Sequence, residues 1–135
     1  MEIIQHKHLL VRAEVLDPIK EEKELKKWLR QLVKQIDMKT IKGPFASYVN
    51  NIGNRGITGF VMIETSHIAI HIWDEPDPAL VQFDVYSCAD FDVGTVKNHL
   101  HIMQPVGVAY TLLDREKELK PLFSTKAHWS GPVNY

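Results

Sequence analysis

The 135-residue sequence lacks paired cysteines, long apolar runs and an excess of charge of either sign. Its single cysteine, Cys88, excludes an internal disulfide and a zinc site made of several cysteines of one chain, and it is typical of a reducing compartment. With 16 Lys and Arg against 17 Asp and Glu, the net charge of −1 gives no basic surface for nucleic acid or an anionic membrane. No apolar run approaches the roughly 18 residues of a membrane span, and the N-terminal residues lack a signal-peptide pattern. We therefore expect a cytoplasmic protein with no nucleic-acid or membrane partner.

The composition predicts one folded domain. Hydrophobic residues make up 44% of the chain and charged residues 24%, which is typical of a globular protein with a real core. There is no internal repeat and no Gly/Ser linker. We expect a single domain over residues 1–114 and a C-terminal tail over 115–135, where the sequence has little periodicity.

Hydrophobic periodicity predicts an α+β fold. Apolar residues at helical spacing indicate a helix over 18–37, for which Asp17 would be the N-cap and Pro18 the first helical residue. A second helix is expected over 93–103, capped by Asp92. Short β-rich segments predict strands at 8–15, 45–49, 57–64, 67–73, 80–87 and 107–113. The resulting order β-α-β-β-β-β-α-β favours a two-layer α/β sandwich, with a mainly antiparallel sheet and two helices on one face. The other face of that sheet would need a partner subunit to cover it.

Titratable residues gather on one face of two predicted strands. Alternation places His67 and His71 on the same side of 67–73, and Asp84 and Cys88 share a side in the next segment. Four strand residues span about 13 Å, too far for both imidazoles to bind one ion, so we expect no metal site. An alternative interpretation is that His67 and His71 are partly exposed strand histidines and Cys88 is a small buried hydrophobe.

Other catalytic patterns are weak or missing. Ser66 has no Gly-x-Ser-x-Gly elbow around it, which argues against a Ser-His-Asp hydrolase. The Gly53–Gly56 stretch lacks the Lys-Ser/Thr and the following helix of a phosphate-binding loop. A thiolate pair of Cys88 and His71 is compatible with the spacing but is unspecific.

Three motifs resemble the prokaryotic S-adenosylmethionine decarboxylases at nearly constant spacing. They are Gly56-Ile57-Thr58-Gly59, Thr65-Ser66-His67-Ile68-Ala69-Ile70-His71-Ile72-Trp73-Asp74-Glu75, and Phe83-Asp84-Val85-Tyr86-Ser87-Cys88. The opening strand around His8 is also similar to that of the family, so that the likeness covers about residues 8–103. The Ser-His-x-x-x-His-x-x-x-Glu core followed by a cysteine is the most specific part.

The resemblance implies an enzyme that makes its pyruvoyl cofactor from its own backbone, without a metal. Ser66 would attack the carbonyl of Thr65 and cleavage would fall between these two residues. Thr58 would steady the intermediate, and His71 would remove the α-proton of Ser66. The pyruvoyl group at position 66 would form a Schiff base with the amine of S-adenosylmethionine and act as an electron sink for decarboxylation. Cys88 would return a proton as general acid.

The resemblance also implies how substrate is held and how chains assemble. Glu75 stands where the family has an acid that binds the ribose hydroxyls, and Ile52 falls near the position of an aromatic that stacks on adenine. Further departures are Thr65 where bacterial members usually have Glu, and Ala89 where they have Gly. Bacterial members are homodimers with sites at the subunit interface. The product would be the aminopropyl donor for polyamine (spermidine) synthesis.

Two alternatives to this function stay open at the level of sequence. One is a pyruvoyl decarboxylase of the same fold that acts on another amino acid, such as ornithine or arginine, because the loop near the adenine differs. The other is a paralogue that is never cleaved and acts as a binding or regulatory subunit.

Overall fold

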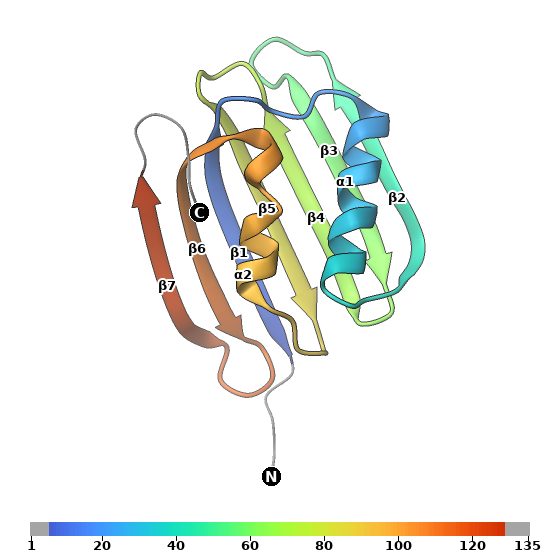
Figure 1. Cartoon of the computed structure of the whole chain (residues 1–135), viewed down its shortest axis with the longest axis vertical. Coiled ribbons are helices and arrows are strands. Elements are labelled where there is room, and N and C mark those ends of the chain that lie inside the picture. Colours follow the sequence, from blue (N-terminus) through green and yellow to red (C-terminus); the bar gives the residue numbers. More distant parts are fainter. Residues whose placement is uncertain (1–5, 129–135) are drawn as a thin grey trace.

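One antiparallel sheet of seven strands forms the body of the computed structural model, which describes residues 6–128 (Figure 1). The strands are β1 (Lys7–Val15), β2 (Thr40–Val49), β3 (Gly56–Ile63), β4 (Ser66–Trp73), β5 (Ala79–Ser87), β6 (Pro105–Asp114) and β7 (Lys120–His128). They lie in the order β2-β3-β4-β5-β1-β6-β7. The first strand of the chain is therefore inserted between β5 and β6, and it pairs antiparallel with both.

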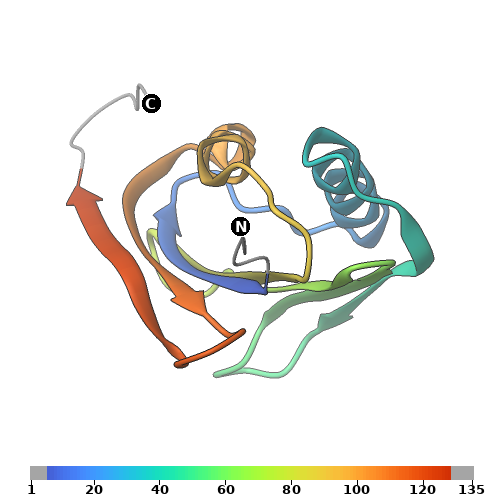
Figure 2. The same cartoon turned by 90° about the horizontal axis from the view of Figure 1, so that it is seen from below.

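The helices α1 (Glu22–Gln35) and α2 (Val93–Asn98), with the short 3-10 helix η1 (His101–Met103), connect these strands. Seen from below, both α-helices lie on the inner side of the curved sheet (Figure 2). The expected two-layer α+β architecture, with a mainly antiparallel sheet and helices on one face, is confirmed. Among residues 6–128, every helix is too short or too polar to cross a membrane.

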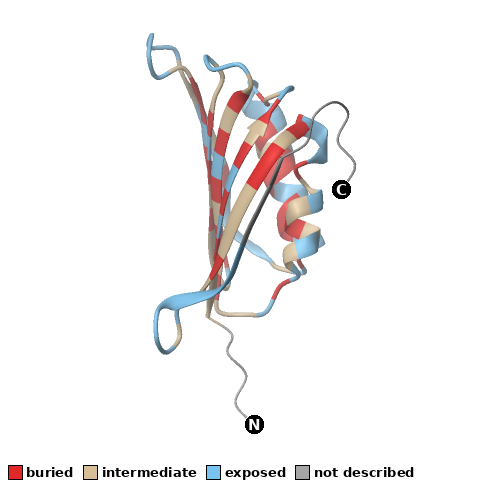
Figure 3. Cartoon of the chain, turned by 90° about the vertical axis from the view of Figure 1, so that its left-hand side faces the viewer, coloured by how far each residue is buried: buried red, intermediate tan, exposed pale blue. Residues whose placement is uncertain are grey.

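Alternation along each strand separates a helix-covered face from an open face (Figure 3). The side chains under the helices are aliphatic and fully buried; they include Leu9, Ala13, Ile57, Val61, Ile68, Ile70, Ile72, Val81 and Val85. The open face is the opposite side of the sheet, which carries His8, His67, His71 and Asp84. Polar and titratable side chains thus sit on the face that the chain's own helices leave uncovered.

Two contacts fix the helices to the sheet and to each other. Leu25 and Leu29 of α1 lie over Gly59 of β3, where an added Cβ would come within 2.7 Å of Leu25 Cδ2. At the other side of α1, the Trp28 indole donates to the His99 carbonyl at 2.9 Å, and His99 Nε2 donates to the Trp28 carbonyl at 2.8 Å. Burial lowers the pKa of His99, so the neutral ring that this pairing uses is favoured.

The start of α1 differs from the expectation. The helix begins at Glu22, with Glu21 as N-cap in an extended conformation, and not at Pro18. Asp17 is not the cap, because its backbone N–H donates to the Met103 carbonyl at 3.0 Å and so holds this segment against the end of η1. A tertiary contact thus replaces the local capping signal.

Other boundaries also shift, for identifiable reasons. Strand β2 begins before the Gly43-Pro44 pair rather than after it, because a proline without an N–H is tolerated on an edge strand, and the register is irregular there. The helix expected over 93–103 is divided into α2 and η1. Part of the expected tail forms β7, which pairs with β6 at the other edge; residues 129–135 of that tail lie outside the described residues.

The close approach of β3 and β4 at Gly56 gives a stability prediction. A Cβ at this position would lie 1.9 Å from the Ile72 carbonyl oxygen, so Gly56→Ala requires the backbone of β4 to shift. We expect a loss of about 1–3 kcal/mol in the free energy of unfolding, measured by urea denaturation. Gly94→Ala in α2 is the matched control, because its Cβ meets nothing closer than 3.6 Å and alanine favours a helix. Equal stability of the two variants would contradict the close approach.

Candidate active site

The predicted cleavage point lies in the tight turn between β3 and β4. Glu64 and Thr65 form the turn, and Ser66 is the first residue of β4. Ser66 has a φ of 147°, a backbone conformation that residues other than glycine rarely adopt. The family resemblance implies that Ser66 attacks the Thr65 carbonyl. This carbonyl accepts a hydrogen bond from the Cys88 backbone N–H at 2.8 Å.

Sheet pairing brings Ser66 and Cys88 together although they are distant in sequence. Ser66 lies opposite Ser87, the last residue of β5, and Cys88 follows directly. Cys88 has a free, partly exposed thiol. Ser87 is fully buried and its hydroxyl accepts from the Ala89 N–H at 2.9 Å, which fixes the chain on the far side of Cys88. Ser66, the Thr65 carbonyl and Cys88 therefore form one half of the predicted site.

Thr58 and His71 form a second group, in the part of the open face farther along β4. They lie opposite one another on β3 and β4, and Thr58 Oγ1 is 3.1 Å from His71 Nδ1. The His71 ring also stacks on Trp73, with centroids 5.8 Å apart. His71 is five positions along β4 from Ser66, a distance of about 16 Å. Within one chain, His71 therefore cannot take the α-proton of Ser66.

Glu75 and Ile52, the two expected substrate-binding residues, line one pocket of about 550 Å³ beyond His71. The Glu75 carboxylate accepts hydrogen bonds from the backbone N–H groups of Gly53 and Arg55, both at 3.1 Å, and these bonds lower its pKa. Ile52 is 85% exposed at the rim. Trp73 lines the same pocket and supplies an aromatic surface beside the carboxylate, a role that the sequence analysis did not assign to it.

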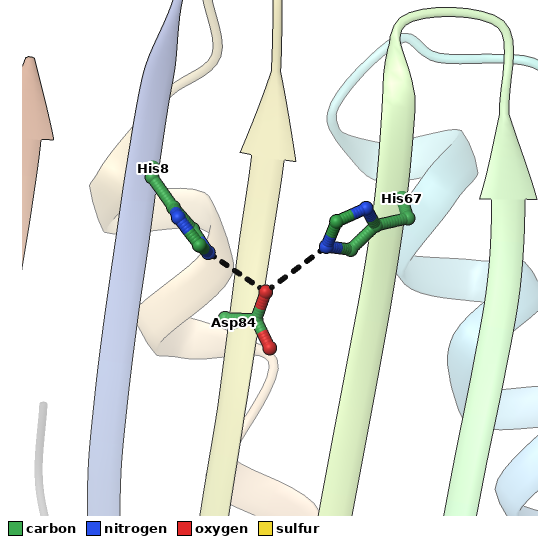
Figure 4. A group of neighbouring side chains, drawn as sticks. All are labelled: His8, His67 and Asp84. Atoms are coloured by element: carbon green, nitrogen blue, oxygen red, sulfur yellow. Dashed lines mark hydrogen bonds and ion pairs between the residues drawn. The ribbon is translucent and has the colours of Figure 1, made fainter. Parts of the chain in front are cut away.

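A third group, which sequence reasoning did not assemble, occupies the middle of the open face (Figure 4). Asp84 Oδ2 on β5 is 2.8 Å from His8 Nε2 on β1 and 3.3 Å from His67 Nε2 on β4. Alternation gave the shared face of His67 and Asp84. The contribution of His8 depends on β1 pairing next to β5, for which the sequence carries no local signal.

Neighbouring aromatic and basic side chains surround this His8–Asp84–His67 cluster. The Arg115 guanidinium lies 3.9 Å from the centre of the Tyr86 ring and 3.2 Å from His8 Nδ1. Burial alone would raise the pKa of Asp84, but the hydrogen bonds from His8 and His67 lower it overall. Asp84 is therefore a carboxylate that accepts from two imidazoles.

Among residues 6–128, the same three residues are the group that could hold a metal ion. The ligand atom that each would offer lies within 4.8 Å of the other two. Their hydrogen bonds argue for another role. Arginine only donates, so His8 Nδ1 accepts from Arg115 and the ring proton sits on Nε2, directed at Asp84. A metal would have to displace that proton and disturb the contact with Arg115. His71, the other histidine considered for a metal, is not in this cluster.

Comparison with known proteins bears directly on this arrangement. The sequence profile of the S-adenosylmethionine decarboxylase family matches residues 7–117. A solved structure described as the adenosylmethionine decarboxylase from Aquifex aeolicus superposes with a TM-score of 0.64 over 85% of this chain and 96% of that one, at 24% identity. That likeness shows a shared fold.

Three curated relatives are each described as an S-adenosylmethionine decarboxylase proenzyme. The relative from Archaeoglobus fulgidus is 30% identical over 64% of this chain and 78% of its own length. Those from Aquifex aeolicus (34%) and Pyrococcus horikoshii (30%) align over 59% and 67% of this chain, and over 53% and 61% of their own lengths. With a profile match over most of the chain and the motif residues on the turn and the open face, this protein belongs to the S-adenosylmethionine decarboxylase family.

Proposed function

We propose that this chain is a self-processing, pyruvoyl-dependent decarboxylase of S-adenosylmethionine that supplies the aminopropyl donor for polyamine synthesis. The observation that carries the proposal is the contact between the Cys88 N–H and the Thr65 carbonyl beside Ser66. The family membership and the relatives' description as proenzymes support it. A cytoplasmic location accords with the single cysteine.

The turn at Thr65 and Ser66 is suited to an acyl shift. The Ser66 hydroxyl attacks the Thr65 carbonyl carbon, the bond from that carbon to the Ser66 nitrogen breaks, and an ester replaces the amide. Negative charge develops on the Thr65 oxygen, where the Cys88 N–H already donates at 2.8 Å. A fixed donor at such an oxygen stabilises the charge without reorganisation.

Backbone conformation at Ser66 favours the same reaction. A non-glycine residue held at a φ of 147° costs on the order of 1–3 kcal/mol, which the surrounding sheet pairing must offset. Breaking the peptide bond between Thr65 and Ser66 releases this constraint. The strain therefore lies at the bond that the proposal cleaves.

The base for the next step must come from a second chain. Removal of the Ser66 α-proton lets the ester oxygen leave as the Thr65 carboxylate; the remaining dehydroalanine is hydrolysed to pyruvoyl and ammonia. His71 of the same chain is about 16 Å away. In a two-fold dimer that packs open face on open face, His71 and Thr58 of one chain meet Ser66 and Cys88 of the other, and both sites are completed together.

The open face has the apolar character that such an interface needs. Large hydrophobic side chains are exposed there at the start of β1 and along β2 and β3: Leu10 at 41%, Phe45 at 55%, Phe60 at 36% and Met62 at 39%. Such an exposed apolar patch marks an interaction surface, and a second copy of the chain presents the same apolar face to it. We therefore propose a homodimer.

The pocket at Glu75 fits a nucleoside. A carboxylate whose pKa is lowered accepts both hydroxyls of a ribose, and the Trp73 ring offers a surface for the adenine. These features favour S-adenosylmethionine over ornithine or arginine, which carry no nucleoside. A pyruvoyl group at position 66, once formed, withdraws electrons from the bond that loses carbon dioxide. Cys88 beside it is placed to return a proton to the substrate carbon.

The first prediction concerns cleavage. Purified wild-type protein should resolve, by intact mass, into pieces 1–65 and 66–135, and only the cleaved form should release carbon dioxide from S-adenosylmethionine. Ser66→Ala should stay a single chain. A wild-type chain that remains intact after long incubation would rule out the enzyme and favour the unprocessed paralogue. Release of carbon dioxide from ornithine or arginine instead would assign the other substrate class.

The second prediction separates the backbone of Cys88 from its thiol. Cys88→Ala keeps the N–H that binds the Thr65 carbonyl, so cleavage should proceed. Loss of the general acid should lower kcat by about 100- to 10,000-fold, measured on the cleaved protein. Turnover at the wild-type rate would show that the thiol is not the proton donor. A block of cleavage would show that the thiol, and not only the backbone, acts in processing.

A further inference from the structure

Cleavage between residues 65 and 66 would change what holds the start of β4. In the intact chain, Ser66 is tied covalently to the turn, and it pairs with Ile63 on β3 and Ser87 on β5. After the cut, residue 66 is a chain end joined only to the nitrogen of His67. Strand ends fray unless side chains secure them. The reactive group at position 66 therefore depends on how firmly residue 67 is held.

His67 is held from three sides on the open face. Its Nε2 donates to Asp84 at 3.3 Å, and its ring stacks on Phe60 with centroids 5.8 Å apart and an interplanar angle of 29°. The edge of Tyr86 closes the third side, also at 5.8 Å. Only 35% of the His67 side chain is exposed. A strand histidine that only faced solvent would not be enclosed by a carboxylate and two aromatic rings.

Asp84 is itself secured from β1, the neighbouring strand on the side away from His67. His8 donates to the same Oδ2 at 2.8 Å, and Arg115 donates to His8 Nδ1 at 3.2 Å while lying over the Tyr86 ring. The chain of contacts thus runs from Arg115, directly after β6, across β1 and β5 to β4. It connects the carboxylate that holds His67 to strands that the cleavage does not touch.

We propose that the His8–Asp84–His67 cluster is a positioning device, in which His67 anchors the chain end that carries the pyruvoyl group after self-cleavage. The inference rests on the proposed function. His67 is a positioning residue here, since it acts through the residue joined to its nitrogen. The cluster matters little before cleavage, while the covalent turn still holds Ser66, and it matters most afterwards.

The test compares His67→Ala and Asp84→Ala with wild type in the cleaved state. Both variants should still cleave, but kcat should fall by about 10- to 100-fold with KM nearly unchanged, the effect of a misplaced reacting group. His67→Gln should recover part of the rate, because its amide nitrogen reaches the place of Nε2. His101→Ala is the matched control: it removes an exposed histidine of η1, which belongs neither to the cluster nor to the open face.

Hydrogen exchange of the β4 amides distinguishes positioning from ordinary stability. In cleaved protein, His67→Ala should speed exchange at the first residues of β4. In uncleaved Ser66→Ala chains, the same change should have little effect. Equal acceleration in both backgrounds, an unchanged kcat, or a folded His67→Ala chain that fails to cleave would each overturn the inference. A wild-type chain that never cleaves would instead refute the proposed function.

Discussion

The fixed rise of a β-strand is the constraint on which this molecule depends. It keeps Ser66 at one end of β4 and His71 about 16 Å along it, so no side-chain movement joins them within one chain. Antiparallel pairing then gives each its neighbours: Cys88 from the end of β5 beside Ser66, and Thr58 from β3 beside His71. Two incomplete groups, one at the β3–β4 turn and one farther along β4, are the result, and a two-fold dimer is the simplest arrangement that completes both.

The same sheet explains why cleavage need not destroy the fold. The cut falls at the junction of the turn and the first residue of β4, and the residues after Ser66 keep their pairing with β3 and β5. Both helices cover the other face and pack on aliphatic residues that lie far from the open-face polar groups. Stability and chemistry are thus assigned to opposite faces, which is possible because successive strand residues point in opposite directions. The His8–Asp84–His67 cluster lies on the open face, and its hydrogen bonds also link β1 and β4 to β5.

Much of this was predictable from sequence because it depends on local patterns. Alternation gave the strands and the shared face of His67 and Asp84, and the resemblance to the decarboxylase family implied Ser66, Cys88 and Glu75. The rest depends on contacts between distant segments. The start of α1 is decided by the bond from Asp17 to Met103, and β7 is an edge strand with little periodicity. The place of His8 beside Asp84 follows from strand order, which no local pattern gives.

The claim that each site is shared between two chains is tested most directly by complementation. Ser66→Ala and His71→Ala chains, carrying different tags, are expressed separately and together, and cleavage is measured by intact mass. Each variant alone should remain uncut. Together, mixed dimers unite the Ser66 of one chain with the His71 of the other, so the His71→Ala chain, and it alone, should be cleaved. Mixed dimers that stay uncut, from a protein whose wild type cleaves, would contradict a site shared in this way.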